Sequence, residues 1–581
     1  MKTDKKPEKN KNLIEKYTLK EKLLMSGLTS LAVSFMFILF GCIDIYANNM
    51  LEFAFTFSDI IGPVLLVFFA VWAALFAILM IFNKGLLNIF TAFIYGLIIS
   101  SYADGFLSDK ALVTSGDVNA MTMLEYNRML IIYVAFSAGF AILSIILKNN
   151  WKKVVVFLSV LLIGMNGASL VSDVATKKLF SDNDINCEYV LSNKGLDTVS
   201  GDENIIYILF DRFDTNYYDE VIEKYPGYFD DLEGFTLYHG ATPVYTRTYP
   251  AAAYMISGVP YKAEVAPTEF FDKAYGESQF LKDLKSNGYN INIFADRYYE
   301  YNDAKSLIGI ADNVESVSSY STNKTEIIKY LSKLSLSRSF RVYLMKTMYR
   351  NANHGVVSTL SNLNCESGTY QDNDAQYYKT IQQNPLTVGN SNKNYTFIYL
   401  HGSHTPHILD ENCEISENAD EISQTVGAFK IVKEYLNQLK ALGVYDNSTI
   451  IIAADHGSPR QETSDYIEQS EELGNLGQTA CIFFKPKNAE NKTLQISEAE
   501  VSTDNIIPTI VQDAQLQTDY DYGKSLFDIK EGESNPRYFY QSIYDINKRK
   551  LCFNVYEIKG NAHDISNWEK IDFIKSEYQW Y

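Results

Sequence analysis

The sequence lacks closely spaced cysteines. Its 581 residues include six cysteines, none of them in a C-x-x-C pair or another spacing typical of a metal site. The cysteines therefore predict no zinc module. Cys365 and Cys413 are candidates for a disulfide if their region is exported, and buried free thiols are the alternative.

Positive charge is also scarce. The formal net charge is −19, and it lies almost wholly in the part of the chain after about residue 175. Because nucleic-acid binding needs a basic face, this acidic region argues against DNA or RNA as a partner.

Long apolar runs are abundant, by contrast, before residue 175. Five of them are free of charge over about the 20 residues that a helix needs to cross a membrane. The runs are Leu23–Ile43, Ile60–Phe82, Gly85–Tyr102, Met129–Leu147 and Val154–Val171. Lipid offers no partner for backbone polar groups, so these segments are expected to be helical.

The lysines around these runs predict their orientation. Lysines are frequent in the N-terminal leader, and Lys84 and the "KNNWKK" connection follow the second and fourth runs. The first and third connections are acidic or nearly neutral. The positive-inside rule then places the N-terminus in the cytoplasm and, after five spans, the rest of the chain outside. The first run is too long for a signal peptide and lacks a cleavage site. We therefore expect a multi-pass protein of the cell membrane.

These patterns divide the chain into five parts. They are a basic cytoplasmic leader (1–22), a transmembrane domain of about five helices (23–175), a polar linker (176–203), an extracytoplasmic α/β domain (204–535) and a C-terminal β subdomain (536–581).

Four short apolar runs in the α/β domain share one design. They are "NIIYILF" before Asp211, "YNINIFA" before Asp296, "YTFIYL" before His401, and "STIIIAA" before Asp455 and His456. Such nearly continuous runs are typical of strands buried on both faces. Helix-like stretches lie between them, so a mainly parallel sheet with helices on both faces is predicted. The alternating segment 537–560 predicts a small C-terminal antiparallel sheet.

Polar residues follow each of these strands, where ligands of an open α/β sheet gather. A single aspartate after a strand is usually only a turn residue. Four such ends together favour a metal site built from carboxylate oxygens and one or two imidazoles.

The segment "TRTYPAAAYMISG" (246–258) adds a hydroxyl to this picture. It predicts a helix from about Tyr249 to Ser257, with Pro250 in its first turn and Gly258 after its end. Thr248 would then lie beside a helix N-terminus, which suits a phosphate, and a nearby cation would make its hydroxyl a nucleophile. The alternative is that Thr248 only caps the helix.

These motifs, taken in order, resemble those of the alkaline phosphatase and sulfatase superfamily. "TYPAAAYMISG" is similar to the nucleophile segment of its phosphodiesterase-type members, "IIYILFD" and "IIIAADHG" to its metal-ligand strands, and "FIYLHGSHTPH" to a segment of membrane phosphoethanolamine transferases. The resemblance covers about residues 203–530. The plan of five helices followed by such a domain resembles lipoteichoic acid synthases and phosphoethanolamine transferases.

The resemblance implies roles for individual residues. Asp211, Thr248, Asp455 and His456 would bind one divalent cation (Mn, Zn or Mg), with Thr248 also the nucleophile that forms a phosphothreonine. His404 would protonate the leaving group or stabilise charge. Candidate substrate-binding residues are Asp296, Arg297, His401 and His407.

Departures from the family patterns narrow the activity. No C/S-x-P-x-R segment is present, so sulfate ester hydrolysis by a formylglycine is not expected. The Asp-x-x-x-His element of two-metal enzymes is missing too, which favours one metal. "RYYEYNDAKS" replaces the Trp-Asn-Arg element of glycerol-phosphate synthases, with Arg297 as a candidate substitute.

The resulting hypothesis is a membrane-anchored phosphotransferase. It would move a phospholipid head group, of the phosphoglycerol or phosphoethanolamine type, to a glycan or lipid acceptor of the cell envelope. The alternatives are a membrane-bound phosphodiesterase or sulfatase-like hydrolase that uses water as acceptor, and a catalytically inert protein that binds envelope polymers.

Overall fold

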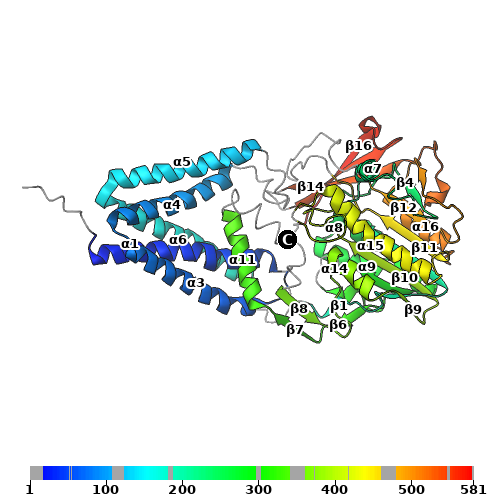
Figure 1. Ribbon diagram of the computed structural model, residues 1–581, viewed down its shortest axis with the longest axis horizontal. Coiled ribbons are helices and arrows are strands. Elements are labelled where there is room, and N and C mark those ends of the chain that lie inside the picture. Colours follow the sequence, from blue (N-terminus) through cyan, green and yellow to red (C-terminus); the bar gives the residue numbers. More distant parts are fainter. Residues whose placement is uncertain are drawn as a thin grey trace, which may run out of the picture.

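The computed structural model describes most of the chain. The described residues are 17–50, 53, 55–107, 123–180, 187–295, 303–339, 360–371, 373–416, 418–458, 479–545 and 550–578. They form an elongated helical part and a compact α/β part, placed end to end along the longest axis (Figure 1).

The N-terminal part is helical. Its elements are α1 (Leu19–Ser34), the π-helical η1 (Phe35–Phe40), α2 (Gly41–Asn48), α3 (Phe57–Ile81), α4 (Lys84–Leu107), α5 (Met123–Leu147), the 3-10 helix η5 (Lys148–Asn150) and α6 (Trp151–Thr176). Among the described residues, four helical stretches are long and apolar enough to cross a membrane: Leu19–Asn48, Phe57–Ile81, Lys84–Ala103 and Leu130–Thr176. The fourth and fifth predicted runs both fall in the last stretch. Within it, Lys148 of η5 has a left-handed backbone (φ +46°) and separates α5 from α6.

Large apolar side chains face outward on these helices. Leu66 is 71% exposed, Ile81 81% and Ile146 67%. Such surfaces are too apolar for water, so the four helical stretches indicate membrane anchoring.

A seven-stranded sheet forms the centre of the α/β part, in the order β13-β4-β12-β11-β3-β10-β5. Its strands are β3 (Glu203–Phe210), β4 (Thr236–Tyr238), β5 (Asn290–Phe294), β10 (Lys393–Leu400), β11 (Ser448–Ala453), β12 (Ile482–Lys485) and β13 (Gln495–Ser497). The strands β11, β3, β10 and β5 are parallel neighbours. β12 is antiparallel to β11 and to β4, so the sheet is mixed.

Both faces of the sheet are covered, which explains the nearly continuous apolar strands. Along β3, Ile205, Tyr207 and Leu209 face one core and the residues between them face the other. The first core packs against α8 (Thr248–Ser257), α9 (Pro267–Glu277), α10 (Gln279–Ser286) and α16 (Ile506–Asp513). The second packs against α7 (Thr215–Lys224), α14 (Asp374–Gln383) and α15 (Glu421–Ala441).

Smaller sheets surround this core. They pair β1 (Tyr189–Leu191) with β6 (Val314–Ser316), β2 (Thr198–Val199) with β9 (Thr387–Val388), and β7 (Ser319–Thr322) with β8 (Ser361–Asn364). The second half of the stretch predicted as a linker thus forms β1 and β2 and pairs with the α/β part. The C-terminal antiparallel sheet has three strands, β14 (Arg537–Asp545), β15 (Lys550–Ile558) and β16 (Trp568–Lys575).

All six cysteines are free thiols, so the candidate disulfide between Cys365 and Cys413 is not formed. Cys413 is buried in the core under α15, whereas Cys365 packs beside Cys187 in a separate cluster. The two sulfur atoms belong to different cores.

Helix α11 (Lys324–Ser339) joins the two parts. It is inserted between β7 and β8 of the α/β part, yet it packs against the N-terminal helices (Figure 1). Ser335 Oγ donates a hydrogen bond to Phe37 O at 2.7 Å, and the Arg338 guanidinium pairs with the Asp44 carboxylate. A Cβ on Gly41 would lie only 1.9 Å from Ser335 Oγ, so this contact needs a glycine.

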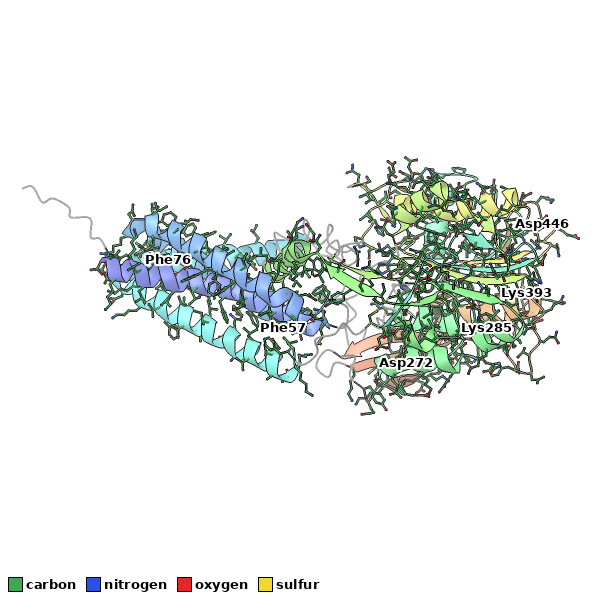
Figure 2. The ribbon with its side chains drawn as sticks, turned by 90° about the horizontal axis from the view of Figure 1, so that it is seen from below. Phe57, Phe76, Asp272, Lys285, Lys393 and Asp446 are labelled. Carbon is green, nitrogen blue, oxygen red and sulfur yellow. The ribbon has the colours of Figure 1, made fainter. Side chains whose placement is uncertain are left out.

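The carboxyl ends of the central strands face the N-terminal helices. Lys393 begins β10, and Asp446 lies two residues before β11. Figure 2 shows both residues at the end of the α/β part that points away from Phe57 and Phe76 of α3. The opposite edge of the sheet, which holds the residues predicted to be functional, therefore lies on the side of the helical part.

Candidate metal centre

Two neighbouring parallel strands bring the two predicted aspartates together. Ala453 of β11 pairs with Leu209 of β3, so Asp211 and Asp455 both emerge at the carboxyl edge. The ligand atoms of Asp211, Asp455 and His456 all lie within 4.8 Å of one another, and the three residues are buried. Two side chains far apart in sequence thus meet a third on one side of the sheet.

Thr248 completes this group from the start of α8. Its Oγ1 lies 3.1 Å from His456 Nε2 and 3.5 Å from Asp211 Oδ2. The helix begins at Thr248, one residue earlier than predicted, and Gly258 ends it in the left-handed conformation with φ +73°. Arg247 is the N-cap residue, and its side chain does not cap the first turn. We call Asp211, Thr248, Asp455 and His456 the sheet-edge cluster.

Each carboxylate of the cluster has one hydrogen-bonded oxygen. Tyr399 Oη donates to Asp211 Oδ2 at 2.5 Å. The backbone N–H groups of Arg212 and His456 donate to Asp455 Oδ1 at 3.1 and 2.9 Å. The other two oxygens, Asp211 Oδ1 and Asp455 Oδ2, are buried and accept no hydrogen bond from the described residues. Each lies 3.6 Å from His456 Nε2.

The ring of His456 is oriented by its own backbone neighbour. Nδ1 lies 2.7 Å from Gly457 O, which fits a protonated Nδ1 that donates to the carbonyl. Nε2 then presents its lone pair to the two aspartates and to Thr248. This arrangement is common for metal-binding histidines.

Burial governs the electrostatics of the cluster. It raises the pKa of Asp211 well above its usual range, and the nearby charge of Asp455 adds to this effect. Burial lowers the pKa of His456, because it disfavours the charged imidazolium. Two buried carboxylates beside a neutral imidazole repel each other, and a cation between them would relieve that repulsion.

The four side chains fit a divalent cation. Thr248 Oγ1, Asp211 Oδ1 and Asp455 Oδ2 lie 3.1, 3.6 and 3.6 Å from His456 Nε2. Ligands about 2.0 Å from a tetrahedral ion are about 3.3 Å apart. Two carboxylate oxygens without hydrogen bonds, one imidazole lone pair and one hydroxyl form a suitable donor set for Zn²⁺, Mn²⁺ or Mg²⁺.

A glycine allows the strand ends to pack this closely. Gly402 has φ +59°, and a Cβ there would lie 2.8 Å from Asp211 N and 2.9 Å from Asp211 O. Ser403 N donates to Asp211 O at 2.9 Å. The loop after β10 therefore holds the backbone of a cluster residue in place.

The predicted histidines occupy this same loop. His404 lies beside the cluster, with its ring centroid 6.5 Å from that of His456, and its Nδ1 is 2.5 Å from Thr405 O. The ring of His401 packs edge-on against His404 at 5.0 Å. His407 follows three residues later, partly buried. Asp296 and Arg297, the other predicted substrate residues, lie outside the described residues.

Three residues that contact this site were not predicted from the sequence. Tyr399 hydrogen-bonds to Asp211, and Arg212 connects the cluster to Ser458 Oγ through Nε (3.1 Å) and to Thr405 Oγ1 through Nη1 (2.9 Å). Asp374 accepts from the backbone N–H groups of His401 and Gly402 at 3.0 and 2.9 Å. Arg212 could have been predicted as a site residue, because it directly follows the predicted ligand Asp211. Asp374 could not, because it starts a helix far from any motif.

A comparison with protein families identifies the family of the α/β part. The family model described as Sulfatase matches residues 203–516, more than half of the chain. That range contains the whole sheet-edge cluster. The comparison with curated proteins finds no matching relative.

Solved structures that match this chain include three from bacteria. The lipoteichoic acid synthase LtaP of Listeria monocytogenes is 12% identical, with 61% of this chain and 85% of that chain covered and a TM-score of 0.34. A protein in the alkaline phosphatase superfamily from Vibrio parahaemolyticus is 11% identical, with 68% and 87% covered and a TM-score of 0.36. The putative sulfatase yidJ of Bacteroides fragilis is 10% identical, with 62% and 87% covered and a TM-score of 0.34.

Proposed function

Since the chain belongs to the sulfatase family, we propose that it is a membrane-anchored, metal-dependent phosphotransferase. It moves a phospholipid head group of the phosphoglycerol or phosphoethanolamine type to a glycan or lipid acceptor of the cell envelope, through a phosphothreonine at Thr248. The observation that carries this proposal is the position of Thr248 Oγ1, 3.1 Å from His456 Nε2 and 3.5 Å from Asp211 Oδ2 at the first residue of α8.

The nucleophile argues for phosphoryl rather than sulfuryl transfer. A formylglycine sulfatase needs a cysteine or serine at this position, and Thr248 is followed by Tyr249 and Pro250 without the arginine of that motif. A threonine hydroxyl attacks phosphorus directly. The uncapped first turn of α8 presents N–H groups and positive potential to the phosphate oxygens.

In the first half-reaction, Thr248 Oγ forms a bond to phosphorus and the bond from phosphorus to the diacylglycerol oxygen breaks. The proton of the threonine hydroxyl passes to solvent. His404 donates a proton to the leaving diacylglycerol, since an Nδ1 bonded to Thr405 O leaves Nε2 for acid–base work. A divalent cation held by the sheet-edge cluster would lower the pKa of the hydroxyl and neutralise charge on the phosphate oxygens.

In the second half-reaction, an acceptor hydroxyl attacks the phosphothreonine. His404 takes the acceptor proton, and the bond from phosphorus to Thr248 breaks as the threonine regains a proton. The chain is unchanged, and the head group has moved from lipid to acceptor. Water in place of the acceptor would give a phosphodiesterase with the same residues.

Membrane anchoring fits a lipid donor. The cluster lies at the sheet edge on the side of the N-terminal helices (Figures 1 and 2), and α11 fixes the α/β part against those helices. We propose that the α/β part lies outside the cell, with the N-terminus in the cytoplasm. The donor would then be a lipid of the outer leaflet.

The test uses the full chain in vesicles of phosphatidylglycerol or phosphatidylethanolamine with labelled head groups. We expect diacylglycerol to be released only when a divalent metal is present, and the label to appear on an added polyol or glycan acceptor. Release of free head group without transfer would establish the hydrolase instead. Metal-independent turnover, or turnover by a Thr248→Ala variant, would overturn the proposal.

A further inference from the structure

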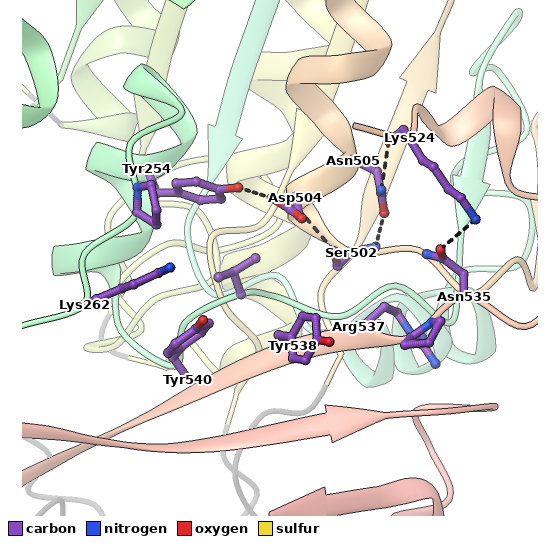
Figure 3. A pocket seen from close by; sticks show the side chains of 13 residues that line it. Tyr254, Lys262, Ser502, Asp504, Asn505, Lys524, Asn535, Arg537, Tyr538 and Tyr540 are labelled. Atoms are coloured by element: carbon purple, nitrogen blue, oxygen red, sulfur yellow. Dashed lines mark hydrogen bonds between the residues drawn. The ribbon is translucent and has the colours of Figure 1, made fainter. Parts of the chain in front are cut away.

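A cavity lies at the same edge of the central sheet as the sheet-edge cluster. It has a volume of about 310 Å³ and lies between α8, residues 502–505 and the start of β14 (Figure 3). β4 and β13 run in the same direction as β11, because β12 is antiparallel to both β11 and β4, and β13 is parallel to β4. The segments that follow β4 and β13, which line the cavity, therefore emerge beside the segments that carry Asp211 and Asp455.

The cavity is close to the nucleophile. β4 is two strands from β11 in the sheet order, a separation of about 10 Å at the usual strand spacing. Thr248 begins α8, and Tyr254 of the same helix lines the cavity six residues later, about 9 Å along the axis. Ser542 N of β14 also donates to Thr246 Oγ1 at 2.9 Å, which ties the cavity wall to the nucleophile segment.

Cationic side chains dominate the cavity wall, although the chain as a whole carries a net charge of −19. Lys262, Lys524 and Arg537 line it, against one carboxylate, Asp504. The oxygen Oδ1 of that carboxylate already accepts from Tyr254 Oη (Figure 3). The local excess of positive charge suits an anionic ligand.

Arg537 gives this wall a buried cation. Its residue is 2% exposed, and its guanidinium donates to Gly240 O at 3.2 Å and to Gly560 O. Glu500 Oε2 lies 3.9 Å from Nη2. The buried Nε–H of Arg537 has no hydrogen-bond partner among the described residues. The protein thus positions a guanidinium here and leaves one of its donors unused.

The remaining wall is suited to a hydroxyl-rich ligand. Tyr538 is 47% exposed, and the ring of Tyr540 also lines the cavity. Aromatic faces pack against the apolar faces of sugars and polyols. Asn505 and Asn535 contribute amide groups beside Lys524, whose Nζ lies 3.4 Å from Asn535 Oδ1 (Figure 3). Amides donate to and accept from hydroxyl groups.

We propose that this cavity is the acceptor site, and that the acceptor is an anionic polyol or glycan whose phosphates pair with Lys262 and Lys524 at opposite ends of the cavity (Figure 3). The inference rests on the proposed function and deepens it. The phosphate-bearing unit is held in the cavity, and the next hydroxyl of the same polymer reaches the phosphothreonine along the sheet edge.

The test compares a Lys262→Ala/Lys524→Ala variant with a Lys530→Ala control. All three lysines are exposed, and Lys530 is a nearby lysine that is not part of the cavity wall. Binding of glycerol phosphate to the full chain in detergent is measured by calorimetry, with chelator present to suppress binding at the sheet-edge cluster. We expect the double variant to bind at least 10-fold more weakly and the control to match the wild type. Equal binding by all three proteins would overturn the inference, as would inorganic phosphate binding as tightly as glycerol phosphate.

A kinetic measurement separates this inference from the proposed function. The rate of adduct formation on Thr248 and the rate of transfer to glycerol phosphate are measured for the same proteins. We expect the double variant to lose transfer at least 10-fold more than adduct formation. Equal losses in both steps would overturn the acceptor site and leave the phosphotransferase standing. Absence of any adduct in the wild type would overturn the proposed function itself.

Discussion

The buried carboxylates of the sheet-edge cluster and of the junction between the two parts differ in what balances their charge. At the sheet-edge cluster, Asp211 and Asp455 are 1% and 0% exposed, and their ion-pair partner is His456, whose pKa burial lowers. At the junction between the two parts, Asp44 is 6% exposed and pairs with Arg338 of α11. Among the described residues, the junction carboxylate thus has an arginine as its ion-pair partner, whereas the sheet-edge carboxylates have a histidine.

This difference separates a structural pair from a functional site. The ion pair at the junction is complete without a ligand and links two surfaces, with the Arg338 side chain 60% exposed. A pair of buried carboxylates facing a neutral imidazole is complete only when a cation joins it. An aspartate therefore serves stability at the junction and cation binding at the sheet-edge cluster. Substitutions can test each of these two roles.

The largest effect is expected from Thr248→Ala. Removing the nucleophile should lower diacylglycerol release by at least about 10³-fold, because no other hydroxyl replaces Oγ1 beside His456 Nε2. Thr248→Ser is the matched control and should keep part of the activity. Initial rates with labelled phospholipid measure both, and an alanine variant within 10-fold of the wild type would contradict the assigned role.

Asp455→Asn should weaken metal binding at least about 100-fold, since it removes a charged ligand oxygen that has no other partner among the described residues. The isosteric amide also removes the repulsion with Asp211, so the metal-free variant should melt no lower than the metal-free wild type. Metal titration followed by thermal melting checks both. Unchanged metal affinity would contradict the cluster as the binding site.

Asp44→Asn provides the contrast at the junction. It should leave metal affinity unchanged and lower the free energy of unfolding by about 1–3 kcal/mol, because Arg338 loses its charged partner. Thermal melting of the full chain with and without metal measures this. A loss of metal affinity here would erase the distinction between the two places.

The meeting of Asp211, Asp455 and His456 at one place could be expected from the sequence, while their roles stay predictions. Asp211, Asp455 and His456 directly follow buried strands, and parallel strands carry such residues to one edge whatever the loops between them. The nucleophile helix was predicted to within one residue because Pro250 and Gly258 mark its two ends.

Contacts made by tertiary structure alone could not be predicted. Tyr399 is one aromatic residue in an apolar strand, and only its pairing beside β3 brings its hydroxyl to Asp211. Asp44 and Arg338 are separated by almost 300 residues, and no pattern in either helix indicates the other. The antiparallel direction of β12 likewise depends on packing rather than on local composition.

A smaller effect is expected from Gly402→Ala. The new Cβ would lie 2.8 Å from Asp211 N at φ +59°, so the loop must shift and displace a cluster residue. We expect a loss of about 1–3 kcal/mol in stability and of up to about 100-fold in rate. Gly443→Ala is the control, since its φ is also positive, at +73°, but its Cβ would meet no atom within 4 Å. That variant should lose stability only, and equal rates for both variants would contradict the argument.

A further effect concerns pH and Asp374, whose carboxylate accepts hydrogen bonds from the backbone N–H groups of His401 and Gly402. Burial raises the pKa of Asp374 to about 6, so the folded protein holds this proton more tightly than the unfolded chain. Its contribution to stability is full below about pH 4 and is lost as pH rises through about 6, a change of about 3 kcal/mol. Asp374→Asn should remove that slope in unfolding measured in chelator from pH 4 to 7. A variant with the same slope as the wild type would show that another group titrates.

The most direct test of the central claim is mass spectrometry of the full chain after brief exposure to donor phospholipid, with and without divalent metal. The account predicts a covalent head-group phosphate on Thr248, formed only with metal and removed when an acceptor polyol is added. An adduct on another residue, or acceptor-dependent turnover without any adduct on Thr248, would contradict it.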